Sequence, residues 1–117
     1  MKHKYLRELF PNSDLPFPYC ENDYPDLDVR ETVNLDWTLT SWLYEHLRCF
    51  KDCARTDLTW RKFDIDGQEL NQIQCIDRMI EDCKIMLVTK ASEVEKINAA
   101  KHDLFMVLEK VYWAMWW

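Results

Sequence analysis

Glycine is almost absent from this chain, which has a single one, Gly67, among its 117 residues. β-Sandwiches and β-barrels need repeated tight turns with positive φ, and phosphate-binding loops need several glycines close together. The lack of glycine therefore argues against an all-β fold and against a glycine-rich nucleotide-binding loop. It favours a protein built mainly from α-helices.

Long apolar runs are also missing. No stretch approaches the roughly 20 consecutive apolar residues that a membrane-spanning helix needs, and the first residues, MKHKYLRELFPNSD, lack the apolar segment of a secretory signal. The five cysteines are an odd number without a secretory context, so we expect reduced, buried thiols rather than a disulfide framework. These absences predict a cytoplasmic protein that has no membrane partner.

The chain has no excess of positive charge. Its formal net charge is −6 at pH 7, so it offers no broad basic face to neutralise phosphates, which supply most non-specific affinity for nucleic acids. Direct binding of DNA or RNA is therefore disfavoured. An acidic surface instead suits a basic surface on another protein.

Large apolar side chains are abundant. Hydrophobic residues make up 48% of the chain and include six Trp, five Tyr and five Phe. A buried aromatic side chain removes about 150 to 250 Å² from water, so a chain of this length can enclose a core of its own. We expect residues 1–117 to form a single helical domain.

Residues 34–54 show the clearest helical pattern. Large apolar residues recur there at intervals of three and four, which places them on one face of a helix. They are Leu35, Leu39, Trp42, Leu43, Leu47 and Phe50. We expect this segment to be the central helix, with this face in the core and with Asn34 or Asp36 as its N-cap.

A β-hairpin is expected over residues 58–70. Apolar and polar residues partly alternate there, and Asp66 followed by Gly67 is a strong signal for a tight turn. The hairpin would join the central helix to the helices that follow.

Two further helices are expected over residues 71–88 and 92–115. Each begins with a capping-box pattern, in which a short polar residue is followed three positions later by Gln or Glu. The pairs are Asn71 with Gln74 and Ser92 with Glu95. Because the connection between the two helices is short, we expect them to be antiparallel neighbours.

Residues 1–30 hold all four prolines, interleaved with aromatic residues. This pattern is typical of an extended arm, and within it residues 2–10 predict a short helix that ends before Pro11. Together the patterns predict a mainly α fold: a three-helix bundle with a small β-hairpin insertion and an extended N-terminal arm.

Candidate metal ligands lie on the central helix. His46, Cys49 and Cys53 share one helix face, and Cys75 or Cys83 could complete a zinc site. Structural zinc sites, however, use closely spaced cysteines in loops, which this sequence lacks. We therefore expect buried thiols, and we expect no metal or other cofactor.

Acidic residues that could hold Mg²⁺ in a helical nucleotide pyrophosphohydrolase fall on the last two helices. They are Asp77, Glu81, Asp82, Glu93 and Glu95. Basic residues are interleaved with them, so we interpret them as solvent-facing rather than convergent. No Ser or Cys nucleophile has a recognisable local signature, so nothing in the sequence supports an enzyme.

Tryptophans gather at the carboxyl end, where Trp113, Trp116 and Trp117 fall within five positions. Three are more than a small domain readily buries, and Trp is enriched at binding hot spots. Phe105, Tyr112 and Trp116 extend a second apolar line along the third helix. These features predict an interface with another protein or with a second copy of the chain.

Three stretches of the chain form a pattern that resembles a known group. They are residues 26–28 and 31–36 (DLD and ETVNLD), Phe63 with residues 66–70 and 75–80 (DGQEL and CIDRMI), and residues 114–117 (AMWW). The pattern is similar to that of small proteins, of no known activity, encoded by tailed phages and prophages of gut and other Gram-positive bacteria. The group has an aromatic residue at the position of Val33. The resemblance implies a phage protein acting in the cytoplasm of an infected bacterial host.

We expect a non-enzymatic protein that binds a host protein and inhibits bacterial defence. A second hypothesis is a protein that sequesters a small ligand such as a nucleotide signal, and a third is a Mg²⁺-dependent all-α nucleotide pyrophosphohydrolase. The candidate binding residues are Glu31, Asn34, Asp36, Trp37, Trp60, Trp113, Trp116 and Trp117. Homo-oligomer formation remains open.

Overall fold

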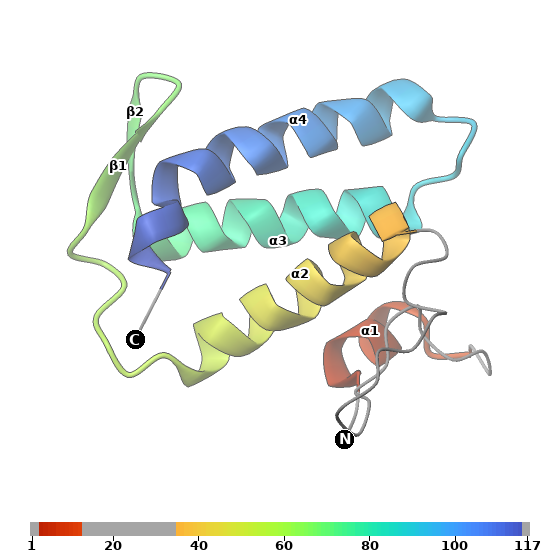
Figure 1. Cartoon of the computed structure of the whole chain (residues 1–117), viewed down its shortest axis with the longest axis horizontal. Coiled ribbons are helices and arrows are strands. Elements are labelled where there is room, and N and C mark those ends of the chain that lie inside the picture. Colours follow the sequence, from red (N-terminus) through yellow and green to blue (C-terminus); the bar gives the residue numbers. More distant parts are fainter. Residues whose placement is uncertain (1–2, 13–34, 116–117) are drawn as a thin grey trace.

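The protein folds mainly into α-helices, as the sequence predicts (Figure 1). The computed structural model describes residues 3–12 and 35–115, so most of the expected arm, with Glu31 and Asn34, and the terminal Trp116 and Trp117 lie outside the described residues. The elements are α1 (Lys4–Leu9), α2 (Leu35–Cys53), β1 (Lys62–Ile65), β2 (Gln68–Asn71), α3 (Gln72–Val88) and α4 (Val94–Val111), followed by a 3₁₀ turn, η2 (Tyr112–Ala114). No helix within the described ranges is long and apolar enough to cross a membrane.

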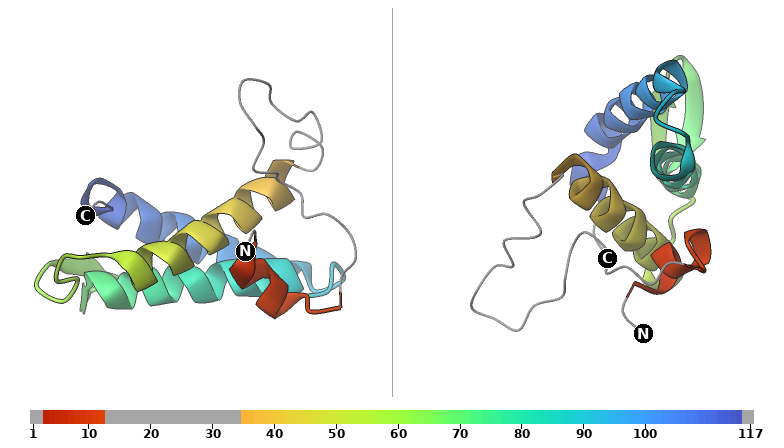
Figure 2. Two further views of the ribbon diagram at one scale, coloured as in Figure 1. Left: turned by 90° about the horizontal axis from the view of Figure 1, so that it is seen from below. Right: turned by 90° about the vertical axis from the view of Figure 1, so that its right-hand side faces the viewer.

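The central helix of the fold is α3 rather than α2. Both α2 and α4 pack along α3 and run in the opposite direction to it, so α2 and α4 point the same way (Figure 1 and Figure 2). The core lies along α3, whose Cys75, Ile76, Met79 and Cys83 are fully buried. Because α2 and α4 contact each other little, the third side of the bundle is open.

The predicted hairpin is confirmed. β1 and β2 pair antiparallel, with Ile65 opposite Gln68. The two residues between them have positive φ, 53° at Asp66 and 77° at Gly67, as a two-residue type I′ turn requires. Ile65 is fully buried, and β1 packs against α4.

One of the two predicted capping boxes is confirmed and the other is wrong. At the start of α3, the Asn71 side chain accepts from the Gln74 backbone N–H at 2.8 Å, and the Gln74 side chain accepts from the Asn71 N–H at 2.9 Å. α4 begins one residue later than predicted, with Glu93 at the N-cap instead of Ser92. The Glu93 N–H donates to the Lys90 carbonyl at 2.9 Å, and this turn places Ser92 outside the helix.

The predicted core face of α2 is wrong over the first half of the helix. Leu35, Leu39 and Trp42 are 61%, 52% and 45% exposed, Leu43 and Phe50 are half-buried, and of the predicted face only Leu47 is fully buried. The side chains that α2 buries are Thr38, Ser41, Tyr44, Glu45 and Leu47. The helix is therefore rotated about its axis relative to the prediction.

Glu45 explains this rotation. Its buried carboxylate accepts hydrogen bonds from the backbone N–H groups of Tyr5 at 2.8 Å and Leu6 at 3.3 Å, and from His3 Nδ1 at 3.1 Å. The N–H groups in the first turn of a helix have no acceptor within that helix, and the helix dipole favours a carboxylate there. The Tyr5 hydroxyl also donates to Asp52 of α2 at 2.6 Å. The Glu45 side of α2 must therefore face α1.

Two ion pairs support the same orientation. Arg48 of α2 donates to Glu8 of α1 at 3.1 Å, and Lys51 of α2 lies 2.6 Å from Asp77 of α3. With these side chains directed toward α1 and α3, the apolar side chains at the start of α2 face outward.

Replacing the Glu45 carboxylate tests this arrangement. We expect Glu45→Gln to lower the free energy of unfolding by about 1 to 3 kcal/mol, because a neutral amide weakens several buried, charge-assisted hydrogen bonds. Chemical denaturation measures the change, with Glu69→Gln on the exposed face of β2 as the matched control. Amide exchange at Tyr5 and Leu6 should accelerate as well. Equal stability of the two variants would mean that Glu45 does not hold α1 to α2.

Candidate functional site

The outward face of α2 carries a continuous stripe without a charged residue. Its members are spaced alternately by four and three positions, all are exposed, and we call them the outer stripe: Leu35, Leu39, Trp42, His46, Cys49 and Cys53. A helix on the surface of a globular protein normally shows a polar face to solvent. A four-three spacing is instead the pattern of a coiled-coil contact face.

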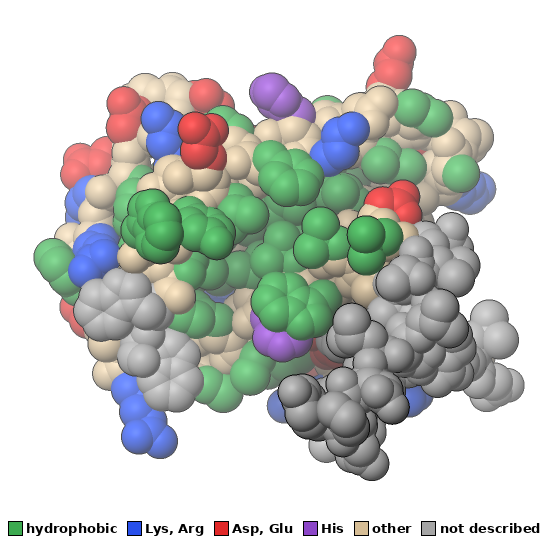
Figure 3. All heavy atoms as spheres, in the orientation of Figure 1, with side chains coloured by type: hydrophobic (Ala, Val, Ile, Leu, Met, Phe, Trp, Pro, Cys, Tyr) green, Lys and Arg blue, Asp and Glu red, His purple; other side chains and the backbone are tan. Residues whose placement is uncertain are grey.

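A groove of about 660 Å³ lies between the outer stripe and the carboxyl end of α4. Its lining is apolar or sulfur-containing apart from one imidazole and one phenol, and consists of Trp42, Leu43, His46, Leu47, Cys49, Phe50, Cys53, Leu108, Tyr112, Trp113 and Met115. Figure 3 shows hydrophobic side chains gathered across this face of the molecule. We call this feature the groove. It is within the usual size range of ligand sites, roughly 300 to 1,000 Å³.

Trp42 and His46 form part of the α2 wall of the groove. Their rings stack with centroids 4.0 Å apart and planes at 18°. His46 Nδ1 lies 2.7 Å from the Trp42 carbonyl oxygen, which can only accept, so Nδ1 carries the hydrogen. This bond and the stacking hold the imidazole against the indole.

Three exposed aromatic residues lie on the α4 side, and we call them the aromatic rim. Tyr112 and Trp113 line the groove, and Phe105 lines an adjacent hollow together with them. Trp113 is 88% exposed, and it meets Tyr112 edge to face at 5.1 Å. The buried Gln72 of α3 donates to the Ala114 carbonyl at 2.7 Å. Because this bond ties η2 to the start of α3, the backbone that presents Trp113 is fixed.

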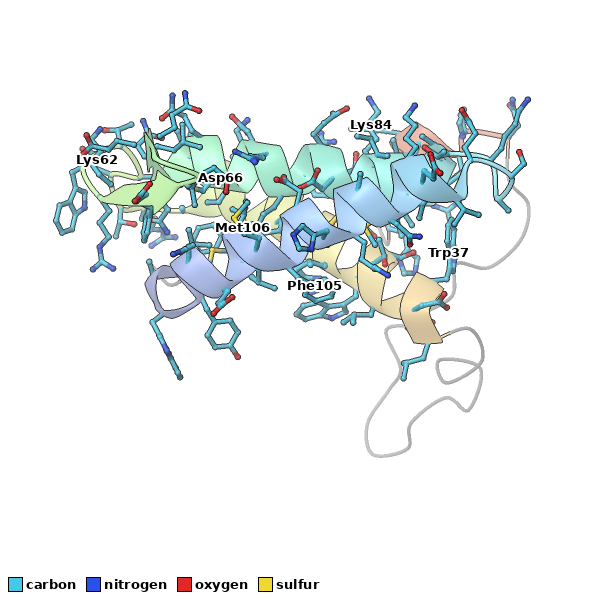
Figure 4. All side chains as sticks on the ribbon, turned by 90° about the horizontal axis from the view of Figure 1, so that it is seen from above. Trp37, Lys62, Asp66, Lys84, Phe105 and Met106 are labelled. Atoms are coloured by element: carbon cyan, nitrogen blue, oxygen red, sulfur yellow. The ribbon has the colours of Figure 1, made fainter. Side chains whose placement is uncertain are left out.

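The structure does not assemble the predicted binding residues into one site. Trp37 packs near Phe10, with ring centroids 5.8 Å apart, at the start of α2, where Asp36 also lies. Trp60 is exposed in the loop after α2, with Arg61 over its ring. The part of α2 that follows Trp37 lies between the two tryptophans and is roughly 24 Å long, and Figure 4 shows Trp37 at the opposite end of the molecule from the hairpin.

Of the predicted binding residues that the structure describes, only Trp113 lines the groove. The groove residues of α2 were predicted as core, so sequence reasoning missed them as a surface. Asp36 is not the N-cap but lies inside the first turn of α2, where its Oδ1 accepts from the Trp37 N–H at 2.9 Å.

The thiols divide into two pairs. Cys75 and Cys83 are buried as predicted, and burial raises the pKa of the Cys83 thiol to about 12. Cys49 and Cys53 are exposed, contrary to the prediction, with their sulfurs 3.7 Å apart. The two pairs do not converge, and within residues 3–12 and 35–115 no group of three or more His, Cys, Asp or Glu could hold a metal ion.

Asp82 is buried between α3 and α4, where the sequence predicted a solvent-facing carboxylate. Arg78 Nε donates to Asp103 at 2.9 Å. Desolvation, together with the adjacent Asp103 carboxylate, raises the pKa of Asp82 to about 8, whereas Arg78 lowers the pKa of Asp103. At neutral pH Asp82 is therefore a protonated acid beside an ionised one.

This carboxyl pair does not resemble a magnesium site. Arg78 already binds Asp103, and within residues 3–12 and 35–115 no third His, Cys, Asp or Glu joins Asp82 and Asp103 in a group that could hold a metal ion. The other candidates are dispersed, since Asp77 pairs with Lys51 and Glu81, Glu93 and Glu95 are exposed. The groove is consequently the strongest candidate for a functional site.

Comparisons of this chain with protein-family models, with curated proteins and with solved structures find no match.

The buried acid predicts a pH dependence. The folded chain keeps the Asp82 proton up to about pH 8, whereas the unfolded chain releases it near the ordinary pKa of 3.8. The stability that this proton contributes is complete below the ordinary pKa and decreases as the pH rises toward 8. Asp82→Asn removes this decrease, so at pH 8 the variant should be more stable than the native chain by about 1 to 3 kcal/mol.

Denaturant titrations across this pH range measure the effect, with Glu69→Gln as a control that removes an exposed carboxylate. Parallel pH profiles for the native chain and Asp82→Asn would contradict the assignment.

Proposed function

We propose that this protein is a non-enzymatic binding protein, and that it holds an apolar segment of another protein in the groove between α2 and α4. The observation that carries the proposal is the groove itself, since no Asp, Glu, Lys or Arg is among its described lining residues. A grooved apolar surface between two helices is a common receptor for an amphipathic helix. Apolar patches of this kind mark interaction sites more often than unused surface.

The aromatic rim supports this choice. Tryptophan and tyrosine dominate the residues that carry binding energy at interfaces, because each contributes a large apolar surface and can hydrogen-bond at its edge. Trp113 and Tyr112 are both more than half exposed, and η2 presents them on a fixed backbone. An exposed indole beside an apolar hollow is the arrangement of a binding anchor.

The chemistry of the groove argues against catalysis. Its titratable groups are His46, Cys49, Cys53 and Tyr112. A cysteine nucleophile needs a lowered pKa, whereas the hydrogen bond to Cys53 and partial burial raise the pKa of the Cys49 thiol. Cys49 therefore stays protonated at neutral pH.

The partner we propose is a protein of an infected bacterial host, and in particular a component of bacterial defence that the groove would inhibit. The resemblance of three stretches to phage and prophage proteins supports this choice. The net charge of −6 also favours a partner with basic residues around its apolar segment.

Two matched tryptophan substitutions test the proposal. Trp113 and Trp60 are both exposed, but only Trp113 lines the groove. We expect Trp113→Ala to weaken binding of a captured host protein by roughly tenfold or more, because a hot-spot truncation costs about 2 kcal/mol. Trp60→Ala should change the affinity little.

The partner is first recovered by affinity capture from a lysate of a Gram-positive host, and its affinity for each purified variant is then measured by titration. Repeated capture without a stoichiometric partner would count against the proposal. If Trp60→Ala weakened binding of the host protein and Trp113→Ala did not, the interface would lie at the loop after α2 and not in the groove.

A second candidate function is the sequestering of a small apolar ligand. The volume of the groove suits such a ligand, but its lining offers no cation for the phosphates of a nucleotide signal. Thermal shift against a library of apolar and nucleotide ligands separates the two functions, because a ligand that binds only the folded chain raises the melting temperature. A melting temperature that rises with nucleotides but not with apolar ligands would contradict the proposal of an apolar ligand.

A further inference from the structure

The outer stripe extends beyond the groove. The groove is lined by the part of α2 from Trp42 to Cys53, whereas Leu35 and Leu39 continue the same stripe for two more turns and are more than half exposed. A single anchor in the groove would leave these leucines in water. The whole stripe is one contact face, because its four-three spacing is unbroken over the length of α2.

The two halves of this face have complementary shapes. The first half presents the large side chains of Leu35, Leu39 and Trp42. The second half carries the smaller Cys49 and Cys53 beside the hollow of the groove. A partner helix that fits this face needs small residues opposite the first half and large residues opposite the second. An antiparallel copy of α2 has this order.

We propose that a second copy of this chain covers the groove, with the α2 helices of the two copies packed antiparallel across a two-fold axis. In this register Leu39 of each copy lies against Cys49 of the other, and Leu35 lies against Cys53. The large side chains in the first half of each stripe then enter the groove of the other copy. The interface is therefore self-complementary, as a two-fold dimer requires.

Charge and dipole directions agree with this dimer. α2 and α4 point the same way within one copy, so an antiparallel second α2 opposes both helix dipoles. Arg48 and Lys51 are held against α1 and α3, and the outer stripe has no charged member, so no like charges meet along it.

The inference rests on the same surface as the proposed function, but not on the identity of a host partner. If the second copy fills the groove, it competes with that partner, and the monomer is the form that binds. The dimer would then be a form that does not bind the partner, because its apolar face is covered.

Light scattering of the reduced full-length chain over a wide range of concentration is the first measurement. We expect a mass of about twice 14.3 kDa at high concentration. Leu39→Glu should weaken the dimer at least tenfold without unfolding the chain, because more than half of the Leu39 side chain is exposed in a single copy. Val88→Glu, at a similarly exposed position on α3, should leave the dimer intact. A monomeric native chain, or a dimer that resists Leu39→Glu, would overturn the inference.

Cysteine cross-linking tests the register. Under mild oxidation Leu39→Cys should give a covalent dimer through Cys49 of the second copy, and the same substitution with Cys49→Ser should not. A Cys49–Cys49 link in the native chain would indicate parallel helices and overturn the antiparallel arrangement. A disulfide between Cys20 and a groove cysteine of the same chain would assign the groove to the chain's own N-terminal segment. In each of these failures the host-partner titration still decides the proposed function independently.

Discussion

The rotation of α2 about its own axis is the constraint on which the rest of the structure depends. It is set by one buried carboxylate, Glu45, which supplies acceptors to the first-turn N–H groups of α1. A buried carboxylate without such partners would cost several kcal/mol. α2 must therefore keep Glu45 toward α1, and the side of the helix opposite Glu45 is left to solvent.

That orientation produces the candidate site. Because α2 and α4 each use α3 as their main neighbour, the bundle has two packed interfaces and one open side. The outer stripe forms one wall of that open side, and the aromatic rim forms the other. The groove is thus a consequence of how charged and apolar residues are divided around α2. It requires no distortion of the helices themselves.

Sequence reasoning succeeded where the signal is local. The Asn71 capping box and the Asp66–Gly67 turn depend on residues within four positions of each other, and both form as predicted. Sequence reasoning failed where the structural element that covers a helix face has to be identified. The apolar periodicity of α2 identifies a helix face, but it cannot tell whether the core or solvent covers that face. Glu45 and Asp82 are both buried by contacts with residues about 20 to 40 positions away, which no local pattern reveals.

The rotation of α2 is tested most directly by the reactivity of the native thiols. The chain is diluted until it is monomeric, treated with a small alkylating reagent and mapped by mass spectrometry, with the denatured chain at the same pH as the reference. The structure predicts that Cys49 and Cys53 react in the native state while Cys75 and Cys83 react only on unfolding. Protection of Cys49 and Cys53 equal to that of Cys75 and Cys83 would show that the outer stripe faces the core, and would contradict the account.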